Sequence, residues 1–379
     1  MKILTNIQTS HLAGISQTFS SFLESAEKEH KRRFDITGVE IIANSKLDKP
    51  KRREKKKGKF TLISLESNFP NISEASRNSK NIQEIENTYV NLINIYQEII
   101  KKERPDVILL NGTYLIPWCL FKASQGFNTP TVLHYHGILS KEVAHWEEKQ
   151  RLLLGQMEKS FDQKGLYYLF PSNLAKEVVE NEIYGHKIVN FSVLPNPVPK
   201  HFFQINKKGS SKNIGIVSRW AMVKNPSFIK RIVTYNQKHS NQFLLNIVTD
   251  LKKDSKVYKG ISESVHFQEP MNNQRLADFY GKMGIIISPS VFETYGNVAQ
   301  EALAANTPAL VSSNMGVSET YRKLGLQDWI VDFNSVKNVY DKAKEISKQG
   351  VNPMVRKMIF DEYSPEKIHG QLLNILSSV

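Results

Sequence analysis

The sequence predicts an α/β fold with two doubly wound, parallel-sheet domains. Three observations support this fold class. Short β-like apolar runs alternate with helical periodicity, the alternation lapses once and then restarts, and 379 residues exceed what one ordinary core holds. We expect the two sheets to face each other across a cleft, with ligands at the carboxyl ends of the strands.

The first half of the chain contains seven strand candidates separated by helical segments. The clearest helix covers residues 82–100, where apolar side chains recur at intervals of three and four and Pro105 follows the end. Further helices are predicted near 18–29 and at 141–161, and Ser172 is the expected N-cap of another. The strands are expected at 2–6, 35–43, 60–65, 106–111, 130–137, 166–170 and 187–194.

The alternation lapses after Pro195, where three prolines precede a Gly-Ser-Lys segment, and this composition predicts a linker. Beyond it, strands are expected at 213–218, 243–248, 264–267, 284–290, 308–313 and 328–333. Ser364 and Pro365 are the expected N-cap and first residue of a last helix. We therefore place a first domain at 1–198, a second domain at 199–360, and a C-terminal helix at 361–379 that can return to the first domain.

The formal net charge of +14 is concentrated in one stretch. From Lys46 to Lys59, KLDKPKRREKKKGK, nine Lys or Arg stand against Asp48 and Glu54, which is +7 and half the total. A like-charged run without apolar periodicity cannot pack, so we expect a solvated, mobile loop. A solubilising role and attraction to an anionic surface are equally good interpretations.

Other features narrow the class of protein. The single cysteine, Cys119, forms no internal disulfide and has no partner for a metal site. No stretch approaches the roughly 18 apolar residues that span a bilayer, and the first residues lack an apolar signal segment. We expect a soluble, cytoplasmic protein, with peripheral association at the inner face of the membrane as an alternative.

Two glutamates flank a small turn at the end of a buried strand. The run at 284–290 is followed by Glu293, the turn 294–296 and a helix that carries Glu301. A strand, a short loop and a helix N-terminus direct unpaired N–H groups at one point, where a phosphate can bind. Carboxylates beside it suit neutral hydroxyls of a sugar and a ribose. On spacing alone, one glutamate favouring the helix dipole and one surface glutamate is the slightly better interpretation.

A cationic pair precedes this region. Arg219 follows a strand, and Lys224 lies five residues on, at the start of the next helix. Two cations projecting from a strand end would neutralise a diphosphate. Alone they fit a solvated loop better, but together with the two glutamates they indicate one site.

These segments resemble the retaining glycosyltransferases of family 4, of the glycosyl transferases group 1, which have the GT-B fold. IGIVSRWAMVKNPSFIKRIV and SVLPNPVPKHF carry part of the resemblance, and it is most specific between Val265 and Glu319. It covers nearly the whole chain. It implies two Rossmann-like domains, a nucleotide-sugar donor on the second and an acceptor on the first.

The resemblance implies a role for each matched residue of the second domain. Glu293 matches the glutamate that holds hydroxyls of the transferred sugar, and Glu301 matches the one that binds the ribose. Arg219 and Lys224 match the pair on the diphosphate. The remaining donor-binding residues are Thr294, Tyr295 and Gly296, whose N–H groups would contact sugar and phosphate, and His266 and Gln268, in the stretch near the nucleobase.

In the first domain the resemblance points to two loops. Gly14 would let the backbone approach the donor phosphate, although an ordinary turn explains it equally well. His134 and His136 share one face by alternation, with Tyr135 on the other. His136 matches the histidine near the transferred sugar, and His134 is expected to be a core or wall residue. Asn196 aligns with a hinge asparagine, or is a turn residue before proline.

The chain also departs from the family pattern. The family usually has glycine where Ser218, Asn225 and Asn306 stand, and a Gly-x-Gly loop where this chain has Thr249 and Asp250. None of these removes a proposed charge or hydroxyl ligand. They bear on the path of the loops around the donor.

No D-x-D triplet occurs, so a carboxylate-held metal is not indicated and no cofactor is expected. The leaving diphosphate would be stabilised by Arg219, Lys224 and helix N-termini. The resemblance implies same-face attack by an acceptor hydroxyl. We expect a metal-independent transfer of a hexose from a UDP- or GDP-linked donor to a glycan or lipid-linked acceptor, in cell-envelope polysaccharide synthesis.

Two alternatives remain open on the sequence. One is a GT-B-fold nucleotide-sugar epimerase. The other, driven by the basic stretch, is a nucleic-acid-binding protein. The chain has no recognised nucleic-acid motif, and the basic stretch lies far from the Glu, Arg and Lys set, so no nucleic-acid partner is expected.

Overall fold

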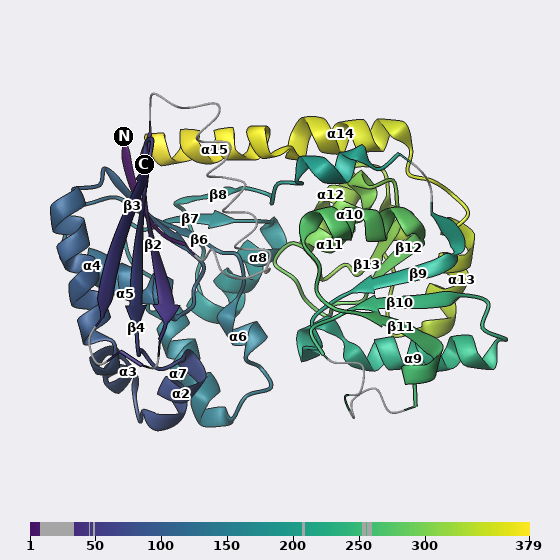
Figure 1. Ribbon diagram of the computed structural model, residues 1–379, viewed down its shortest axis with the longest axis horizontal. Helices are drawn as coiled ribbons and strands as arrows, with labels where there is room; N and C mark the ends of the chain where they lie inside the picture. Colours follow the sequence, from purple (N-terminus) through teal and green to yellow (C-terminus); the bar gives the residue numbers. More distant parts are fainter. Residues whose placement is uncertain (8–33, 45, 48–49, 207–208, 252–254, 256–259) are drawn as a thin grey trace. The chain divides into compact units, whose positions relative to one another are not determined.

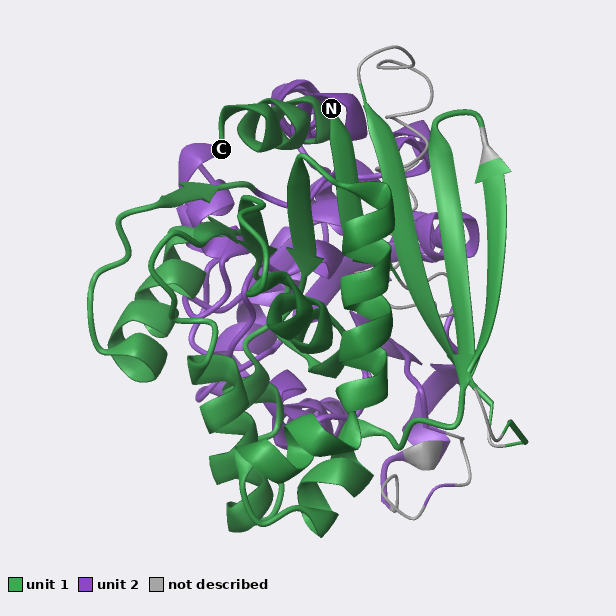
Figure 2. Ribbon diagram, turned by 90° about the vertical axis from the view of Figure 1, so that its left-hand side faces the viewer, with its two compact units in different colours: residues 1–194, 369–379 green, residues 195–368 purple. Residues whose placement is uncertain are grey.

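A computed structural model describes residues 1–7, 34–44, 46–47, 50–206, 209–251, 255 and 260–379. The chain divides into two compact units, shown in Figures 1 and 2. Unit 1 comprises Met1–Leu194 and His369–Val379, and unit 2 comprises Pro195–Ile368. The division thus lies at the start of the proline-rich segment, and the last helix, α15 (Pro365–Ser378), runs from unit 2 into unit 1. Gly14 and the helix predicted near 18–29 fall outside the described residues.

Unit 1 contains an eight-stranded sheet in the order β3-β4-β2-β1-β5-β6-β7-β8 (Figure 1). Every pairing except β3 with β4 is parallel. Central strands such as β5 are buried throughout, as a parallel strand covered on both faces must be. The strands are β1 (Lys2–Ile7), β2 (Asp35–Ala43), β3 (Lys51–Lys57), β4 (Phe60–Ser67), β5 (Val107–Asn111), β6 (Thr131–His134), β7 (Tyr167–Phe170) and β8 (Phe191–Val193).

The basic stretch corrects one expectation, because residues 51–57 form a strand and not a mobile loop. β3 pairs antiparallel with β4, from Lys51 opposite Glu66 to Lys57 opposite Phe60. An edge strand needs no apolar pattern, since the ladder to its one neighbour satisfies the backbone and its side chains can stay in water. Lysines on such an edge also prevent pairing with other chains.

The structure divides both of the long helices expected in the described part of unit 1. The helix expected at 141–161 is instead α6 (Leu139–Glu142) and α7 (Glu148–Lys159), with residues 143–147 in neither. Ser172 caps α8 by accepting from the Ala175 N–H at 3.0 Å, which confirms that prediction. The single helix expected at 82–100 is instead two, divided at Tyr89, whose ψ of 13° is not helical. The helices of unit 1 are α2 (Ile72–Asn78), α3 (Ile82–Thr88), α4 (Val90–Glu103), α5 (Leu115–Ser124), α6 (Leu139–Glu142), α7 (Glu148–Lys159), α8 (Asn173–Val178) and a π-helical turn (Val179–Tyr184).

Unit 2 contains a five-stranded, wholly parallel sheet in the order β11-β10-β9-β12-β13. The strands are β9 (Ser210–Val217), β10 (Leu244–Val248), β11 (Val265–Gln268), β12 (Met283–Ser288) and β13 (Ala309–Val311). The helices are α9 (Pro226–Lys238), α10 (Asn273–Lys282), α11 (Asn297–Ala304), α12 (Val317–Lys323), α13 (Val336–Ile346) and α14 (Pro353–Tyr363). The α/β class with parallel sheets is therefore confirmed.

The strand predicted at 328–333 is wrong. Residues Gln327–Trp329 form a 3-10 turn, and only Ile330 makes a bridge, to Val311. The apolar side chains Trp329 and Phe333 are buried. The apolar pattern of the sequence therefore predicted the burial of these residues correctly, but not whether their backbone pairs with another strand. No helix of the described residues is long and apolar enough to cross a membrane.

Candidate functional site

The predicted donor residues gather at the carboxyl edge of the unit 2 sheet. Because β9 to β12 are parallel, the residues that follow them share one edge, which is where open α/β sheets bind ligands. Arg219 follows β9, Asp250 follows β10, Gln268 ends β11, and Glu293 follows β12. Backbone hydrogen bonds join these strand ends, such as that from the Thr249 N–H to the Gln268 carbonyl at 3.0 Å.

Lys224 and Glu293 are in direct contact. Lys224 ends a 3-10 turn (Met222–Lys224), and its Nζ lies 2.9 Å from Glu293 Oε2. The Ser290 hydroxyl donates to the other carboxylate oxygen at 2.6 Å. The backbone keeps the two loops together, because the Val291 N–H donates to the Val223 carbonyl at 2.9 Å. Each oxygen of Glu293 therefore has one fixed partner, and both side chains remain partly exposed.

The turn between Glu293 and α11 is held on its far side by the loop after β13. Glu293 donates its N–H to the Asn314 carbonyl and accepts from the Gly316 N–H, at 3.2 and 3.0 Å. Gly296 has φ of +116°, and a Cβ there would lie 2.8 Å from Met315 Cε. Only glycine fits this conformation and this space without strain. Tyr295 is a buried side chain, so only its backbone can face a ligand.

The N-terminus of α11 is the helix start at which the sequence predicts an anion site. Gly296 is its N-cap, and no side chain within the described residues caps it. The first N–H groups of such a helix carry its positive end. Beside them, the Asn196 Nδ2 group donates to Asn297 Oδ1 at 2.7 Å. The buried Asn196 Oδ1 has no hydrogen-bond partner in the described part of the chain.

Glu301 lies inside α11 and has a different environment from Glu293. The buried Tyr280 hydroxyl donates to Glu301 Oε2 at 3.1 Å. Removal of the carboxyl from water raises the pKa of Glu301 to about 7, and the Tyr280 hydrogen bond lowers it only in part. The two glutamates thus differ chemically: one belongs to an ion pair, and the other is a desolvated carboxyl that titrates near neutrality.

The remaining predicted residues of unit 2 lie at the same edge of the sheet but do not take part in the Lys224–Glu293 contact. Arg219 is exposed, and the next residue, Trp220, donates its N–H to Asp250 Oδ1 at 2.9 Å. Asp250, one of the departures from the family pattern, therefore joins the ends of β9 and β10. His266 is exposed and Gln268 partly so, both on the edge strand β11.

Two other departures prove conformationally equivalent to glycine. Asn225 and Asn306 have φ of 57° and 60°, in the left-handed region. Asparagine is the non-glycine residue that adopts this region most easily. Asn225 also caps α9 by accepting from the Phe228 N–H. The loop path that glycine would allow is therefore retained.

In unit 1, β6 ends at His134, earlier than the predicted strand at 130–137, so His136 lies in the loop beyond it and strand alternation does not place it. The two histidine rings nevertheless lie together. Their ring centroids are 3.9 Å apart, and Tyr135 points elsewhere, its hydroxyl 2.7 Å from that of Tyr184. His134 is buried, in keeping with a core residue. Burial lowers the pKa of His136 to about 4 and that of His134 well below its usual value, so both rings are neutral at pH 7.

The structure adds residues that sequence reasoning missed. Asn6 is the last residue but one of β1, Asn111 ends β5, and the two exchange hydrogen bonds with each other. Asn111 also contacts Thr5 and, at 3.3 Å, His136 Nε2. The signal in the sequence that could have identified both asparagines is a polar residue near the end of an apolar strand. Both strands, β1 and β5, are largely buried.

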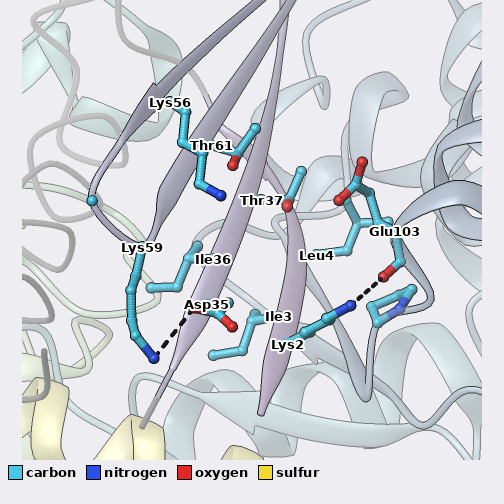
Figure 3. A pocket seen from close by; sticks show the side chains of 12 residues that line it. Lys2, Ile3, Leu4, Asp35, Ile36, Thr37, Lys56, Lys59, Thr61 and Glu103 are labelled. Atoms are coloured by element: carbon cyan, nitrogen blue, oxygen red, sulfur yellow. Dashed lines mark hydrogen bonds and ion pairs between the residues drawn. The ribbon is translucent and has the colours of Figure 1, made fainter. Parts of the chain in front are cut away.

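A separate pocket of about 460 Å³ lies at the amino ends of β1, β2 and β4 (Figure 3). Lys59 pairs with Asp35 there at 3.4 Å, and the Lys2 Nζ group donates to the Glu103 carbonyl. Parallel α/β sheets bind ligands at the opposite, carboxyl edge. This pocket is therefore distinct from the predicted site.

Comparison with known proteins shows that the sequence of this chain is similar to glycosyltransferases. Residues 197–365, inside unit 2, match the family described as Glycosyl transferases group 1. An uncharacterized glycosyltransferase from Methanocaldococcus jannaschii is 28% identical over 120 residues, 31% of this chain and 31% of that protein. The D-inositol 3-phosphate glycosyltransferase of Streptomyces scabiei is 38% identical over 63 residues, 17% of this chain and 14% of that protein. The match spans less than a third of the length of these curated relatives.

Solved structures match along the whole chain. The sucrose-phosphate synthase of Thermosynechococcus elongatus has a TM-score of 0.74 at 14% identity, covering 100% of this chain and 98% of that one. An E. coli structure described as trehalose-6-phosphate bound with UDP-2-fluoro glucose has a TM-score of 0.68 at 12% identity, covering 100% and 99%. At such identities the likeness shows the fold alone, and that fold is GT-B, with two Rossmann-like units.

Proposed function

We propose that this protein is a retaining glycosyltransferase that moves a hexose from a nucleotide-sugar donor to a hydroxyl of a glycan or glycolipid. The observation that carries the proposal is the Lys224–Glu293 contact beside the uncapped start of α11. A cation and open N–H groups suit a diphosphate, and a carboxylate suits sugar hydroxyls. The match to Glycosyl transferases group 1 over the same unit supports it.

In the proposed reaction, the acceptor oxygen bonds to the anomeric carbon on the face from which the diphosphate leaves. The bond between that carbon and the diphosphate oxygen breaks, and the hydroxyl proton passes to the departing phosphate. Arg219, Lys224 and the start of α11 stabilise the charge that develops there, which is electrostatic preorganisation without a bound metal. Glu293 holds the sugar, and Glu301 holds the ribose.

The finer assignments rest on the resemblance to family 4. They are a UDP- or GDP-linked donor without a further cofactor, an acceptor carried on a glycan or lipid, and a place in cell-envelope polysaccharide synthesis. His266 and Gln268 are assigned to the nucleobase, and His136 to the transferred sugar.

A two-stage assay tests the proposal. A thermal-shift panel of UDP, GDP, ADP and their sugars first identifies the base, because the matching nucleotide stabilises the folded protein. The matching donor is then incubated alone and with glycan acceptors. Transfer to an acceptor supports the proposal. A new sugar nucleotide formed from the donor alone identifies an epimerase instead, and stabilisation by none of the nucleotides contradicts donor binding.

We also propose that β3 docks the enzyme on the anionic inner face of the membrane. The side chains of Lys51 to Lys56 are all exposed, and Glu54 is the one acidic member among them. Two of the charges are partly offset, because Arg53 pairs with Glu66 at 2.8 Å and Arg52 with Glu54 at 3.4 Å. The remaining exposed lysines, Lys51, Lys55 and Lys56, lie on the edge strand of the sheet, and each contributes about 1 kcal/mol near an anionic surface.

A further inference from the structure

A row of polar side chains crosses the sheet of unit 1 near the amino ends of β1, β2 and β4. In the strand register, Thr61 of β4 lies opposite Thr37 of β2 on one side and opposite Lys56 of β3 on the other. Residues opposite each other on paired strands have their side chains on the same face of the sheet. The two threonines and the lysine are therefore neighbours on one face, and all three line the pocket of Figure 3.

Three polar groups of this row point into one part of the pocket. Figure 3 shows the Lys56 ammonium and the Thr37 and Thr61 hydroxyls directed toward the same space. Within the part of the chain that the structure describes, none of these three groups has a hydrogen bond or an ion pair. Both threonines are half-buried and Lys56 is exposed, so a ligand can reach all three. Three hydrogen-bond donors therefore converge on one space, and no described side chain serves as their acceptor.

The carboxylates of the pocket lining are offset by neighbouring lysines. Asp35 pairs with Lys59 at 3.4 Å, and the Glu103 carboxylate pairs with Lys102 at 3.6 Å. The Lys2 ammonium donates to the backbone carbonyl of Glu103, which has no net charge. Since each of these acidic groups already has a cation beside it, the positive charge of the row is not neutralised within the described lining. Such a row attracts an anion.

A phosphate monoester has the chemistry that these groups recognise. Its terminal oxygens accept hydrogen bonds, and the ammonium and the two hydroxyls each supply at least one donor. At pH 7 such a group carries about 1.5 to 2 negative charges, which the lysine partly neutralises. The pocket has a volume of about 460 Å³, large enough to hold a small organic molecule attached to the phosphate.

We propose that this pocket binds a phosphate monoester, of a soluble molecule or of a lipid head group, with the phosphate oxygens held by Lys56, Thr37 and Thr61. The pocket lies at the amino edge of the unit 1 sheet, and the proposed reaction uses neither this edge nor these residues. The ligand is therefore distinct from the nucleotide-sugar donor, and the proposal does not depend on the proposed function. Because Lys56 belongs to β3, a lipid head group here would add a specific contact to the docking proposed above.

The ¹³C-methyl spectrum of the threonine-labelled chain tests the site directly. Thr37→Val and Thr61→Val assign the two signals, since each variant loses one signal and keeps a β-branched side chain. The probes are glycerol 3-phosphate and dihexanoyl phosphatidic acid below its micelle concentration, which carry the same group on a soluble molecule and on a lipid. Glycerol is the control without phosphate. We expect at least one probe to shift both signals saturably, and glycerol to shift neither.

A response to glycerol 3-phosphate assigns the site to a soluble phosphate monoester, and a response to the lipid alone assigns it to a head group. In either case Lys56→Met should weaken the binding of that probe about tenfold, because it removes a charge-assisted hydrogen bond. Lys55→Met is the matched control, since Lys55 is an exposed lysine of the same strand whose side chain points to the opposite face. It should leave the affinity unchanged.

The proposal is overturned if neither probe gives a saturable shift up to about 10 mM, or if glycerol gives the same shifts. It is also overturned if Lys56→Met binds the probe as tightly as the parent does. Equal weakening of binding in Lys56→Met and Lys55→Met overturns it as well, because that result indicates attraction by net charge alone.

Discussion

Lys224 Nζ lies 2.9 Å from Glu293 Oε2, although the two residues are predicted to bind different parts of one donor molecule. The contact is compatible with both roles. A lysine ammonium has three N–H donors, so one can pair with Glu293 while two face phosphate oxygens. Each carboxylate oxygen of Glu293 has a second lone pair for a sugar hydroxyl. In the proposed donor complex, the pair would join the diphosphate and sugar subsites, with each residue positioning the other.

We expect Lys224→Ala and Arg219→Ala each to lower turnover by about 10² to 10³, because each removes a preorganised donor from a developing anion. The double variant should lose less than the product of the two losses, since both residues act on one diphosphate. Steady-state kinetics with the donor identified in the panel measures this. Lys212→Ala, an exposed lysine near the start of β9, is the matched control. Normal turnover in either single variant removes that residue from the site. Activity in EDTA should equal that without it.

The two glutamates should separate binding from transfer. Glu293→Gln should mostly slow turnover, because its carboxylate is proposed to hold the transferred sugar. Glu301→Gln should mostly weaken binding of the bare nucleoside diphosphate, which lacks the sugar. Isothermal titration and kinetics on both variants make the comparison. Equal effects on the affinity for the bare diphosphate would contradict the assignment of Glu301 to the ribose.

The pKa of Glu301 predicts a pH-dependent affinity. Ribose hydroxyls donate more strongly to the ionised carboxylate, so nucleotide binding should weaken several-fold as pH falls below about 7. The phosphate groups of the nucleotide also titrate in this range. The phosphates affect the parent and Glu301→Gln equally, so the ratio of the nucleotide affinities of the two proteins cancels the effect of phosphate titration. A ratio that stays constant between about pH 5.5 and 8.5 would show that Glu301 does not titrate there.

Folding stability should respond to the same group with the opposite sign. The carboxyl of Glu301 ionises near 4.5 in the unfolded chain and near 7 in the folded one. Between these values the folded state binds more protons, so the free energy of unfolding falls as pH rises, by at most about 3 kcal/mol. Denaturant unfolding of the parent and Glu301→Gln checks this. The variant should have a flatter profile over that interval.

Gly296→Ala should destabilise unit 2 and weaken nucleotide binding together. The new Cβ meets Met315 Cε at 2.8 Å, and φ of +116° is unfavourable for alanine, at a cost of about 1–3 kcal/mol. Gly155→Ala, in α7, is the control, because it has open space around it and should leave stability unchanged or higher. Unfolding midpoints and nucleotide titrations measure both effects. If Gly296→Ala has the unfolding midpoint and the nucleotide affinity of the parent, this turn tolerates a side chain and the argument from its geometry is wrong.

The basic edge strand predicts salt-dependent binding to anionic vesicles. Replacing six residues by serine should abolish co-sedimentation with phosphatidylserine vesicles at about 0.15 M salt. They are Lys51, Arg52, Arg53, Lys55, Lys56 and Lys57. A control variant removes the same charge from exposed lysines of unit 2, namely Lys212, Lys238, Lys323, Lys337, Lys348 and Lys357. If both variants pellet like the parent, the docking proposal is wrong. Equal losses in both would indicate attraction by net charge alone.

Much of the fold could be predicted because it depends on local patterns. The strand at 35–43, the N-cap Ser172 and the helix start at Pro365 follow from side-chain periodicity and capping chemistry, which act over a few residues. The helix division at Tyr89 could not be predicted this way. The Tyr89 hydroxyl donates to the Pro70 carbonyl, far away in the sequence, and the apolar periodicity continues unbroken through the division.

The sequence by itself determined which charged groups follow which strands, and hence that Arg219, Lys224, Glu293 and Glu301 belong to one edge. Only the tertiary structure decided how they are used. Lys224 meets Glu293 because neighbouring strands bring their loops together, and Glu301 acquires its pKa from the burial around Tyr280. The basic stretch became a strand because β4 supplied a partner for its backbone. Pairing and desolvation depend on neighbours distant in the sequence, so no local pattern could report them.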